Sequence, residues 1–311
     1  MKTERRALVT GGGGFIGSHL VRRLLGEGYG VRVLDNFATG RRENLASVED
    51  AVDLVEGDVQ SYERVHNATR GVDLVFHQAA LPSVPRSIQD PLTTNATNVT
   101  GTLNVLLAAR DENVERVVFA SSSSLYGANP NLPKREDMAC APIAPYAVSK
   151  LAAEGYCRSF FSVYGLETVA LRYFNIFGPG QDPMSQYAAV IPRFVTLALA
   201  GKRPVVHGDG EQSRDFTYID NAIDANLLAA TTGDIGGEVM NVACGARISL
   251  NSVIKSISKL IDQEIDPIYT DPRPGDVQHS LADISRAEAL MGYVPKISLE
   301  AGLERAIPSY S

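Results

Sequence analysis

The sequence predicts an α/β fold: a doubly wound parallel sheet followed by a smaller α/β lobe at the carboxyl-terminal end. Short runs rich in Val, Leu and Ile alternate with longer amphipathic stretches over residues 7–174. This alternation is typical of buried parallel strands that are separated by helices. A glycine-rich turn directly follows the first apolar run, and polar or small residues follow the later runs. Ligands of such sheets bind at the carboxyl ends of the strands, where these residues are expected to meet.

The glycine-rich turn lies between the apolar run Ala7–Val9 and a stretch with helical periodicity, Ser18–Leu25. A strand, a glycine turn and a helix in this order are typical of dinucleotide binding, because the free N–H groups of the helix start face the pyrophosphate. Two spacings fit the motif: one uses Gly12, Gly14 and Gly17, and the wider one uses Gly11, Gly14 and Gly17. A glycine turn without any ligand is the alternative.

Asp35 ends the second apolar run, about 20 residues beyond the glycine turn, where a carboxylate meets the adenine ribose hydroxyls. A carboxylate there repels a 2′-phosphate, so the sequence favours NAD over NADP. Arg41 and Arg42 follow closely and are the residues that could instead favour NADP. We interpret both as part of a solvated loop.

The next strand ends carry further candidates. Asp58 follows the third apolar run and either holds the adenine amino group or caps the helix that begins near Ser61. The fourth run, residues 72–77, leads into small residues at 79 and 80, and its His77 is interpreted as structural. A helix is expected from about Leu92 to Asn113, and the fifth run, residues 117–120, precedes four serines.

Tyr146 and Lys150 are four residues apart in a helix expected to start after Pro145, so they share one helix face. A nearby ammonium and a nicotinamide cation both favour the phenolate and lower the tyrosine pKa from about 10. A phenol with such a pKa is a better general base. A surface tyrosine above a solvated lysine is the alternative interpretation.

The bulk composition bounds the class of protein. The chain has 311 residues, a net charge of −7, 44% hydrophobic residues and no apolar stretch long enough to span a membrane. The acidic balance argues against a nucleic-acid partner. Three scattered cysteines, at 140, 157 and 244, indicate neither a disulfide framework nor a metal site, and the amino terminus shows no signal peptide. We therefore expect a cytoplasmic protein without a metal.

Taken together, the glycine turn, the serines at 121–124 and the Tyr-x-x-x-Lys pair resemble the extended short-chain dehydrogenase/reductases, which have a Rossmann fold. The segments 171–180, 207–210, 213–216 and 273–276 make the chain similar to the UDP-hexose and UDP-N-acetylglucosamine 4-epimerases over essentially its whole length. The resemblance implies the following NAD-binding residues: Gly11, Gly14, Phe15, Ile16, Gly17, Asp35, Asn36, Asp58, Val59, Ala79, Ala80, Asn98, Tyr146, Lys150 and Tyr173.

The resemblance also implies a mechanism and a substrate site. Tyr146, helped by Ser122, takes the proton of the sugar 4-hydroxyl while hydride passes to NAD; Lys150 tunes the tyrosine and holds the nicotinamide ribose. The 4-keto sugar then rotates about its link to the diphosphate, and hydride returns to the opposite face of the sugar. The implied UDP-sugar contacts are Ser83, Ser123, Ser124, Asn175, Ala189, Val190, Val205, His207, Arg214, Arg273, Asp276 and Ser280. Ion pairs of Arg214 with Asp215 and of Arg273 with Asp276 are the alternative for the two arginines.

Substrate preference is expected to depend on Ser280, because family members with a small residue there accept an N-acetyl group. We expect interconversion of UDP-GlcNAc and UDP-GalNAc, and of UDP-Glc and UDP-Gal. A 4,6-dehydratase is disfavoured, since three serines replace its Thr-Asp-Glu. A UDP-uronate 4-epimerase or decarboxylase stays open, with Arg86 as its cationic contact. An NAD-binding regulator without turnover is the remaining alternative. It is disfavoured because such a protein would lack Ser122, Tyr146 or Lys150, and all three are present.

The expected division is an NAD-binding domain over residues 1–174 and a UDP-sugar lobe over residues 175–311. Segments near 238–243 and 280–284 are expected to return to the first domain. Apolar helices around residues 98–109 and 151–163 are expected to pair in a homodimer.

Overall fold

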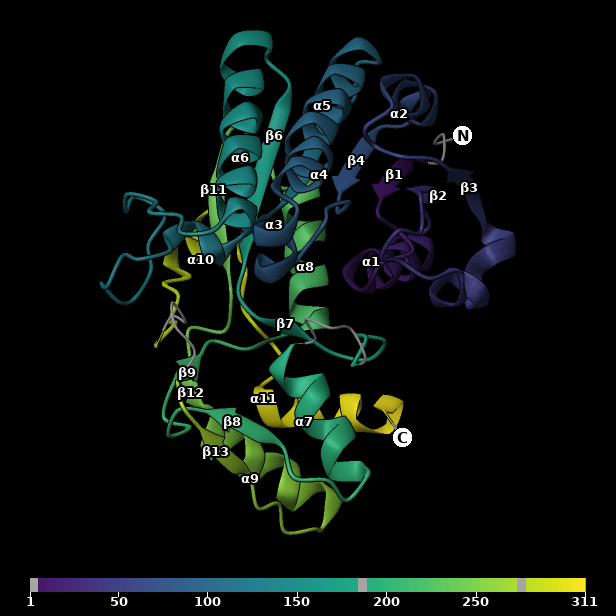
Figure 1. The fold of residues 1–311 in the computed structure, drawn as a ribbon. Coiled ribbons are helices and arrows are strands. Elements are labelled where there is room, and N and C mark those ends of the chain that lie inside the picture. Colours follow the sequence, from purple (N-terminus) through teal and green to yellow (C-terminus); the bar gives the residue numbers. More distant parts are fainter. Residues whose placement is uncertain (1–4, 184–188, 273–277, 311) are drawn as a thin grey trace.

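A computed structural model describes residues 5–183, 189–272 and 278–310. Its centre is a parallel sheet of seven strands in the order β11-β6-β5-β4-β1-β2-β3 (Figure 1). Their bounds are β1 Arg6–Thr10, β2 Gly30–Asp35, β3 Val52–Glu56, β4 Leu74–His77, β5 Arg116–Ser122, β6 Glu167–Tyr173 and β11 Val239–Val242. The strand order reverses between β1 and β4, which is where doubly wound sheets bind ligands. The predicted fold class is confirmed.

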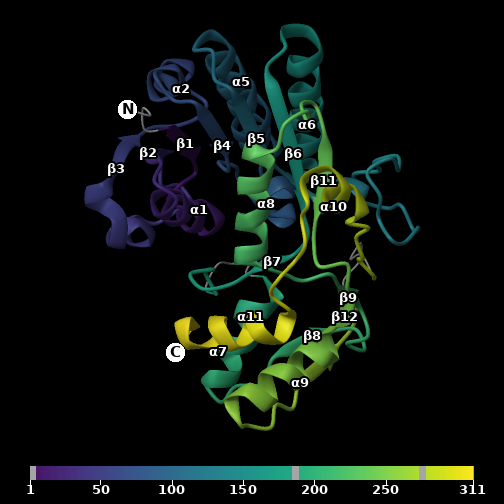
Figure 2. The same ribbon diagram turned by 180° about the vertical axis from the view of Figure 1, so that it is seen from behind.

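Helices cover both faces of the sheet. On one face lie α2 (Tyr62–Thr69), α5 (Gly101–Asp111) and α6 (Pro145–Tyr164), and on the other lie α1 (Phe15–Gly26) and α8 (Ile219–Thr231) (Figures 1 and 2). Strand β5 shows why the apolar runs are nearly continuous. Val117 and Phe119 pack into the core on one face, while Val118 and Ala120 pack into the core on the other. A strand buried on both faces has no need for polar alternation.

The carboxyl-terminal lobe is built from α7 (Val190–Leu199), α9 (Leu250–Ile261) and α11 (Leu299–Ala306) around the parallel pair β8 (Val205–His207) and β13 (Ile268–Thr270). Two further short pairs join β7 (Ile176–Phe177) to β10 (Thr217–Tyr218), and β9 (Ser213–Arg214) to β12 (Ile248–Ser249).

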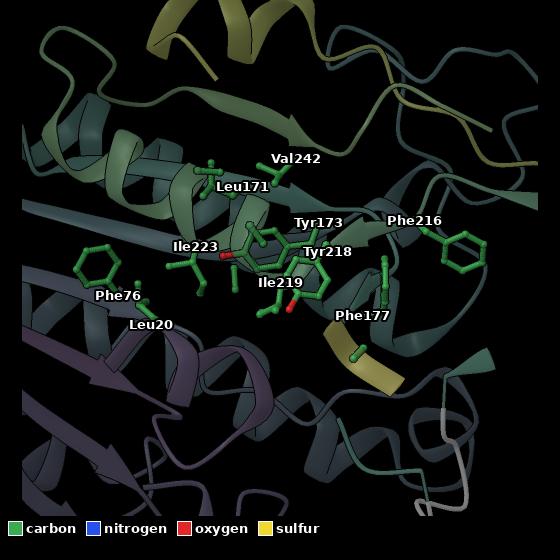
Figure 3. Packing of buried hydrophobic residues seen from close by; sticks show 14 of the residues in the cluster. Leu20, Phe76, Leu171, Tyr173, Phe177, Phe216, Tyr218, Ile219, Ile223 and Val242 are labelled. Carbon is green, nitrogen blue, oxygen red and sulfur yellow. The ribbon is translucent and has the colours of Figure 1, made fainter. Parts of the chain in front are cut away.

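One apolar core connects the lobe to the sheet (Figure 3). Phe76 and Leu171 contribute to it from strands of the sheet, Ile219 from the start of α8, and Phe177 and Phe216 from the lobe. Because close-packed cores deform little, the two parts hold their relative position.

Segments from the second half of the chain lie within the sheet domain. Strand β11 pairs with β6, and residue Ala282 forms a bridge to Lys134. Helix α10 (Ser285–Met291) packs beside β11. Helix α8 also lies on the sheet, against β5 and β6. The sheet domain therefore contains more of the second half than a boundary at residue 174 gives it.

The helix expected over residues 92–113 is divided. It consists of α4 (Pro91–Asn95), a π-helical turn at Ala96–Thr100 and then α5; a short helix, α3 (Val84–Gln89), precedes it. The π turn coincides with the hydrogen bonds of Asn98, whose side chain contacts Leu81 and Ser149 instead of solvent. Such turns occur frequently at functional sites because they redirect one side chain. The η1 segment (Arg42–Ala51), η3 (Ser123–Tyr126) and η4 (Ile307–Tyr310) are 3₁₀ helices.

Candidate active site

The glycine turn is closely packed at the residues of both spacings, since a Cβ at Gly12 would lie 2.7 Å from Val33. Gly11 has φ +71°, which favours glycine, and a Cβ there would lie 2.7 Å from the Ala79 backbone. A Cβ at Gly17 would lie 2.1 Å from the Gly11 carbonyl oxygen, so only glycine lets α1 approach β1 this closely. Gly14 precedes α1 without a side-chain cap. The first-turn N–H groups, including those of Phe15 and Ile16, are thus available to a pyrophosphate, and the turn fits NAD.

Asp35 lies at the carboxyl end of β2, with its carboxylate beside the glycine turn. It accepts hydrogen bonds from the Gly13 N–H at 2.8 Å and the Phe37 N–H at 2.7 Å. Burial raises the pKa of this carboxyl group above its usual value, against the effect of these hydrogen bonds. Both arginines of the following loop are engaged by carboxylates: Arg41 pairs with Asp182 at 2.7 Å, and Arg42 pairs with Glu56.

Asp58 does not cap α2, and that alternative is wrong. The cap is Ser61, whose hydroxyl accepts the N–H of Arg64, while Asp58 accepts a hydrogen bond from the Asn36 amide at 2.8 Å. Buried Val59 follows, and its carbonyl oxygen accepts from the Asn104 amide at 3.0 Å. The Asp58 carboxylate also accepts the Gln60 N–H at 2.8 Å, so it is fixed at the end of β3.

The loop after β4 closes the other side of the glycine turn. The Ala79 N–H donates to Thr10 Oγ1 at 3.3 Å, and Ala80 follows on the same half-buried stretch. His77 is buried, with its ring nitrogens 2.7 Å from Thr10 Oγ1 and 2.9 Å from Thr102 Oγ1. Burial lowers its pKa to about 3. This histidine is thus a neutral structural residue.

Three predicted catalytic residues meet where α6 crosses the end of β5. The Tyr146 phenol lies next to the Ser122 side chain, and the Ser122 and Ser124 hydroxyl oxygens lie 2.9 Å apart. Lys150 is buried one helical turn further along, and its ammonium donates to the Ala120 carbonyl at 2.8 Å. The side chains on α6 are therefore held against the last residues of β5.

Burial dominates the acid–base properties of this group. It raises the pKa of Tyr146 above its ordinary value, while the hydrogen bond with Ser122 lowers it. Burial also lowers the pKa of Lys150 to about 8. The expected depression of the tyrosine pKa by the lysine is not present in this state, since the ammonium is bonded to a backbone carbonyl.

Tyr173, a predicted cofactor contact, lies at the end of β6. Its hydroxyl is buried in a polar cluster with the amides of Gln78, at 3.2 Å, and Asn226, at 2.8 Å. Asn98 fixes the neighbouring loop by accepting the Leu81 N–H at 2.8 Å.

A cavity of about 270 Å³ lies between β7, α7 and β8, beyond the end of the sheet. Six of the residues predicted to contact the UDP-sugar line it: Asn175, Ala189, Val190, Val205, His207 and Arg214. Arg193 and Gln212 also line it. The sequence analysis missed these two because neither belongs to a recognisable motif. The cavity thus combines apolar walls with two guanidinium groups, which are suited to phosphates.

The proposed ion pair of Arg214 with Asp215 is not formed. Asp215 is fully buried, and its carboxylate accepts hydrogen bonds from the Cys244 N–H at 2.9 Å and the Ala282 N–H at 3.2 Å. Burial raises its pKa to about 6. The Asn175 amide donates to the Asp215 carbonyl at 2.9 Å. Asp215 thus joins the lobe to segments that border the sheet.

Four other predicted sugar contacts do not line this cavity. Ser123 and Ser124 continue from β5, beside the catalytic group, and Ser83 caps α3 with φ +100°. Ser280 is half-buried and joined to Ser213 by a backbone hydrogen bond of 3.0 Å. Arg273 and Asp276 lie outside the described residues.

No group of side chains suited to a metal ion occurs in residues 5–183, 189–272 and 278–310. Over the same ranges, none of the helices has the length and apolar character needed to cross a bilayer.

Comparison with known proteins identifies the family. The sequence profile of the NAD dependent epimerase/dehydratase family matches residues 7–243. The chain belongs to this family. A UDP-glucose 4-epimerase of Mycolicibacterium smegmatis is 37% identical over 306 residues, which are 97% of each chain.

Solved structures agree with this assignment. A UDP-N-acetylglucosamine 4-epimerase from Methanobrevibacter ruminantium, in complex with UDP-N-acetylmuramic acid, is 41% identical, with a TM-score of 0.95 over 99% of this chain and 98% of that one. A UDP-glucose 4-epimerase from Thermus thermophilus, in complex with NAD, is 35% identical, with a TM-score of 0.88 over 98% of both chains. Other full-length relatives are named UDP-glucuronate 4-epimerase and UDP-N-acetyl-alpha-D-glucosaminuronate decarboxylase. The cofactor of this UDP-sugar 4-epimerase family member is NAD.

Proposed function

We propose that the chain interconverts UDP-hexoses at C4, acting on UDP-GlcNAc and UDP-GalNAc and also on UDP-Glc and UDP-Gal. The observation that carries this proposal is the placement of Tyr146 next to Ser122, with Lys150 on the same helix face, at the carboxyl edge of the sheet. These three residues lie at the same edge of the sheet as the glycine turn and Asp35, which we propose bind NAD. The full-length 4-epimerase relatives support the same conclusion.

The chemistry divides between the cofactor and the chain. When bound, NAD supplies reversible oxidation and reduction at one sugar carbon. Tyr146 Oη takes the proton of the sugar 4-hydroxyl and later returns it. Ser122 holds the phenol in place, and its hydrogen bond favours the phenolate. Lys150 supplies the positive charge of this region, and its amino group lies where it can exchange the Ala120 carbonyl for a ribose hydroxyl.

Epimerisation requires firm anchoring of the diphosphate and a loosely held hexose, because the sugar must present both faces. In our proposal Arg214, Arg193 and His207 hold the nucleotide diphosphate in the cavity. Residues 175–311 then provide most of the UDP-sugar site, and residues 1–174 most of the NAD site. Ser83, Ser124 and Ser280 border the hexose with small side chains.

The test is an assay with purified protein, UDP-GlcNAc and no added cofactor, followed by proton NMR of the sugar C4 position. We expect UDP-GalNAc signals to appear without net consumption of NAD. The matched variant is Y146F, which removes only the phenol oxygen. It should fold and bind NAD like the wild type and lose most activity, typically 10²-fold or more, about the contribution of a general base. Wild-type turnover by Y146F would refute the assignment of the base.

A UDP-uronate 4-epimerase or decarboxylase is the second candidate, and one observation favours it. Arg86 is half-buried on α3, beside the Ser83 loop, and its guanidinium has no hydrogen-bond or ion-pair partner within the described part of the chain. A guanidinium in this place could hold a sugar carboxylate. UDP-glucuronate in the same NMR assay distinguishes the candidates, and R86Q should abolish turnover of the uronate alone.

We further propose that the protein is a cytoplasmic homodimer. Exposed apolar side chains gather on α3, α4 and α6, which pack against one another: Ile88, Leu92, Val148, Tyr156 and Val163. Leu92 is 83% exposed. A twofold mate on these helices would bury this surface. The three cysteines, all free, suit a reducing compartment.

A further inference from the structure

A buried ion pair lies directly behind the proposed catalytic group. Glu154, on α6, and Arg172, on β6, have side chains that are 4% and 5% exposed, with Arg172 Nη2 2.6 Å from Glu154 Oε1 and Nε 3.0 Å from Oε2. The bidentate geometry holds both side chains in one arrangement. No step proposed above uses this pair, and burying two charges is costly unless they are well paired.

Glu154 extends the register of Tyr146 and Lys150. The three residues are spaced four apart, so they lie in one row along α6. Each contacts one of three consecutive residues of β5: Tyr146 contacts Ser122, Lys150 contacts the Ala120 carbonyl, and Glu154 Oε2 accepts the Ser121 hydroxyl at 2.7 Å. Ser121 is the immediate neighbour of Ser122, so a shift of one moves the other.

The same guanidinium continues the network towards the lobe. Arg172 Nη1 donates to the Tyr126 hydroxyl at 2.9 Å, and that hydroxyl donates to Asn241 Oδ1 at 2.7 Å. Asn241 in turn donates to the carbonyls of Lys134, at 2.9 Å, and Asp283, at 3.0 Å. A chain of buried hydrogen bonds therefore runs from the end of β5 to the segment that follows Ser280.

We propose that Glu154, held by Arg172, is a positioning residue that places Ser122 against the Tyr146 phenol. It does not touch the substrate. The ionisable groups around it are Lys150 and Cys157 on α6, Arg172 on β6, Tyr126 on η3 and Cys140 on the following loop. Its carboxylate fixes the carboxyl end of β5 relative to α6, and the hydrogen bond between Ser122 and Tyr146 depends on that placement. This inference rests on the proposed function only for the role of the phenol as a base.

The test compares E154Q with a matched control, E167Q. Both oxygens of Glu154 accept an Arg172 N–H, so an amide nitrogen at either position faces a donor and one of the two bonds to Arg172 is lost. The remaining contacts can then no longer hold the side chain in its bidentate arrangement. E167Q removes the carboxylate of the Arg116–Glu167 pair, which joins β5 to β6 at the opposite end of the strands. Both variants should lower the melting temperature. Only E154Q should lower kcat, by about tenfold, with KM little changed.

The decisive measurement is titration of the phenol in the NAD-bound protein, by ultraviolet difference spectroscopy against Y146F. Because Ser122 favours the phenolate, E154Q and S122A should both raise the apparent pKa, by about one unit. The apparent pKa of the acidic limb of the kcat–pH profile should rise by the same amount. The double variant E154Q/S122A should move neither quantity further, since both changes act through one hydrogen bond.

A lowered melting temperature of E154Q with an unchanged titration would overturn the proposal, as would additive shifts in the double variant. If E154Q does not fold, E154L/R172M removes both charges and keeps the volume, a replacement that buried ion pairs often tolerate. The same shift is then expected. The titration needs no turnover, so absence of epimerase activity would refute the proposed function and leave the positioning role to be decided by the titration.

Discussion

Replacement of Gly17 by Ala tests whether the close approach of α1 to β1 makes the cofactor site. The added Cβ would lie 2.1 Å from the Gly11 carbonyl oxygen, and ordinary contacts begin at 3.4 Å, so the backbone must move by about 3.4 − 2.1 = 1.3 Å. The two neighbouring atoms, Gly11 C and Gly12 Cα, are also backbone, at 2.8 and 2.9 Å. No flexible side chain can absorb the overlap.

The magnitude follows from two opposing effects. Overpacking costs about 1–3 kcal/mol, and alanine regains up to about 1 kcal/mol of helix propensity. With this overlap against backbone we expect a net loss of about 2 kcal/mol in the free energy of unfolding. Such a shift should also remove at least one of the N–H bonds that we propose for the pyrophosphate. A bond to a charged group contributes about 1.5–3 kcal/mol, so the Kd for NAD should rise roughly 10- to 150-fold.

The control is G26A, in the same helix. Nothing lies within 4 Å of a Cβ at Gly26, so this variant should gain a few tenths of a kcal/mol and bind NAD normally. Denaturant unfolding measures the stability, and isothermal titration calorimetry of the cofactor-free protein measures the Kd. Equal NAD affinity of G17A and G26A would refute the argument that this contact shapes the pyrophosphate site.

Three further predictions follow from the site and the surface. S280Y should reduce turnover of UDP-GlcNAc roughly 10- to 100-fold by overfilling the site, while turnover of UDP-Glc is spared, as measured by NMR. Equal loss of both activities would contradict a role of residue 280 in substrate preference. The pKa of His77 is about 3 in the folded state and 6.5 in the unfolded state. As the pH falls from 6.5 to about 3, the unfolded state therefore binds this proton first, and the free energy of unfolding decreases. H77Q should remove a dependence on the order of 5 kcal/mol in pH-dependent denaturant unfolding, and an unchanged slope would contradict it. L92E should convert the proposed dimer to monomers in sedimentation experiments, whereas an unaltered sedimentation coefficient would contradict a dimer interface on these helices.

Local chemistry made much of the site predictable. The alternation of apolar runs and helices, the glycine turn and the acidic end of β2 act within about 30 residues of sequence. The pairing of Tyr146 with Lys150 depends only on helical spacing. Six residues that the family resemblance assigns to the UDP-sugar line one cavity, although they come from four separate segments.

Only the tertiary structure decided the points where two local solutions were equally good. Both glycine spacings satisfy a tight turn, and only the folded backbone shows that Gly11 has a positive φ while Gly12 and Gly17 are closely packed. Asp58 and Ser61 both suit a helix start, and only the folded backbone shows that Ser61 is the cap. The π turn at Asn98 is likewise not visible in the periodicity, because its hydrogen bonds go to residues 17 and 51 positions away.

The sequence by itself determined the class of fold and the chemical groups that are present, because strand, helix and turn preferences are set by neighbouring residues. It could not determine how Glu154, Arg172 and Ser121 combine, nor that α8 lies on the sheet. Those contacts join segments far apart in the chain. Their partners are chosen by packing and by the cost of leaving a buried charge unpaired, and these forces act only once the chain has folded.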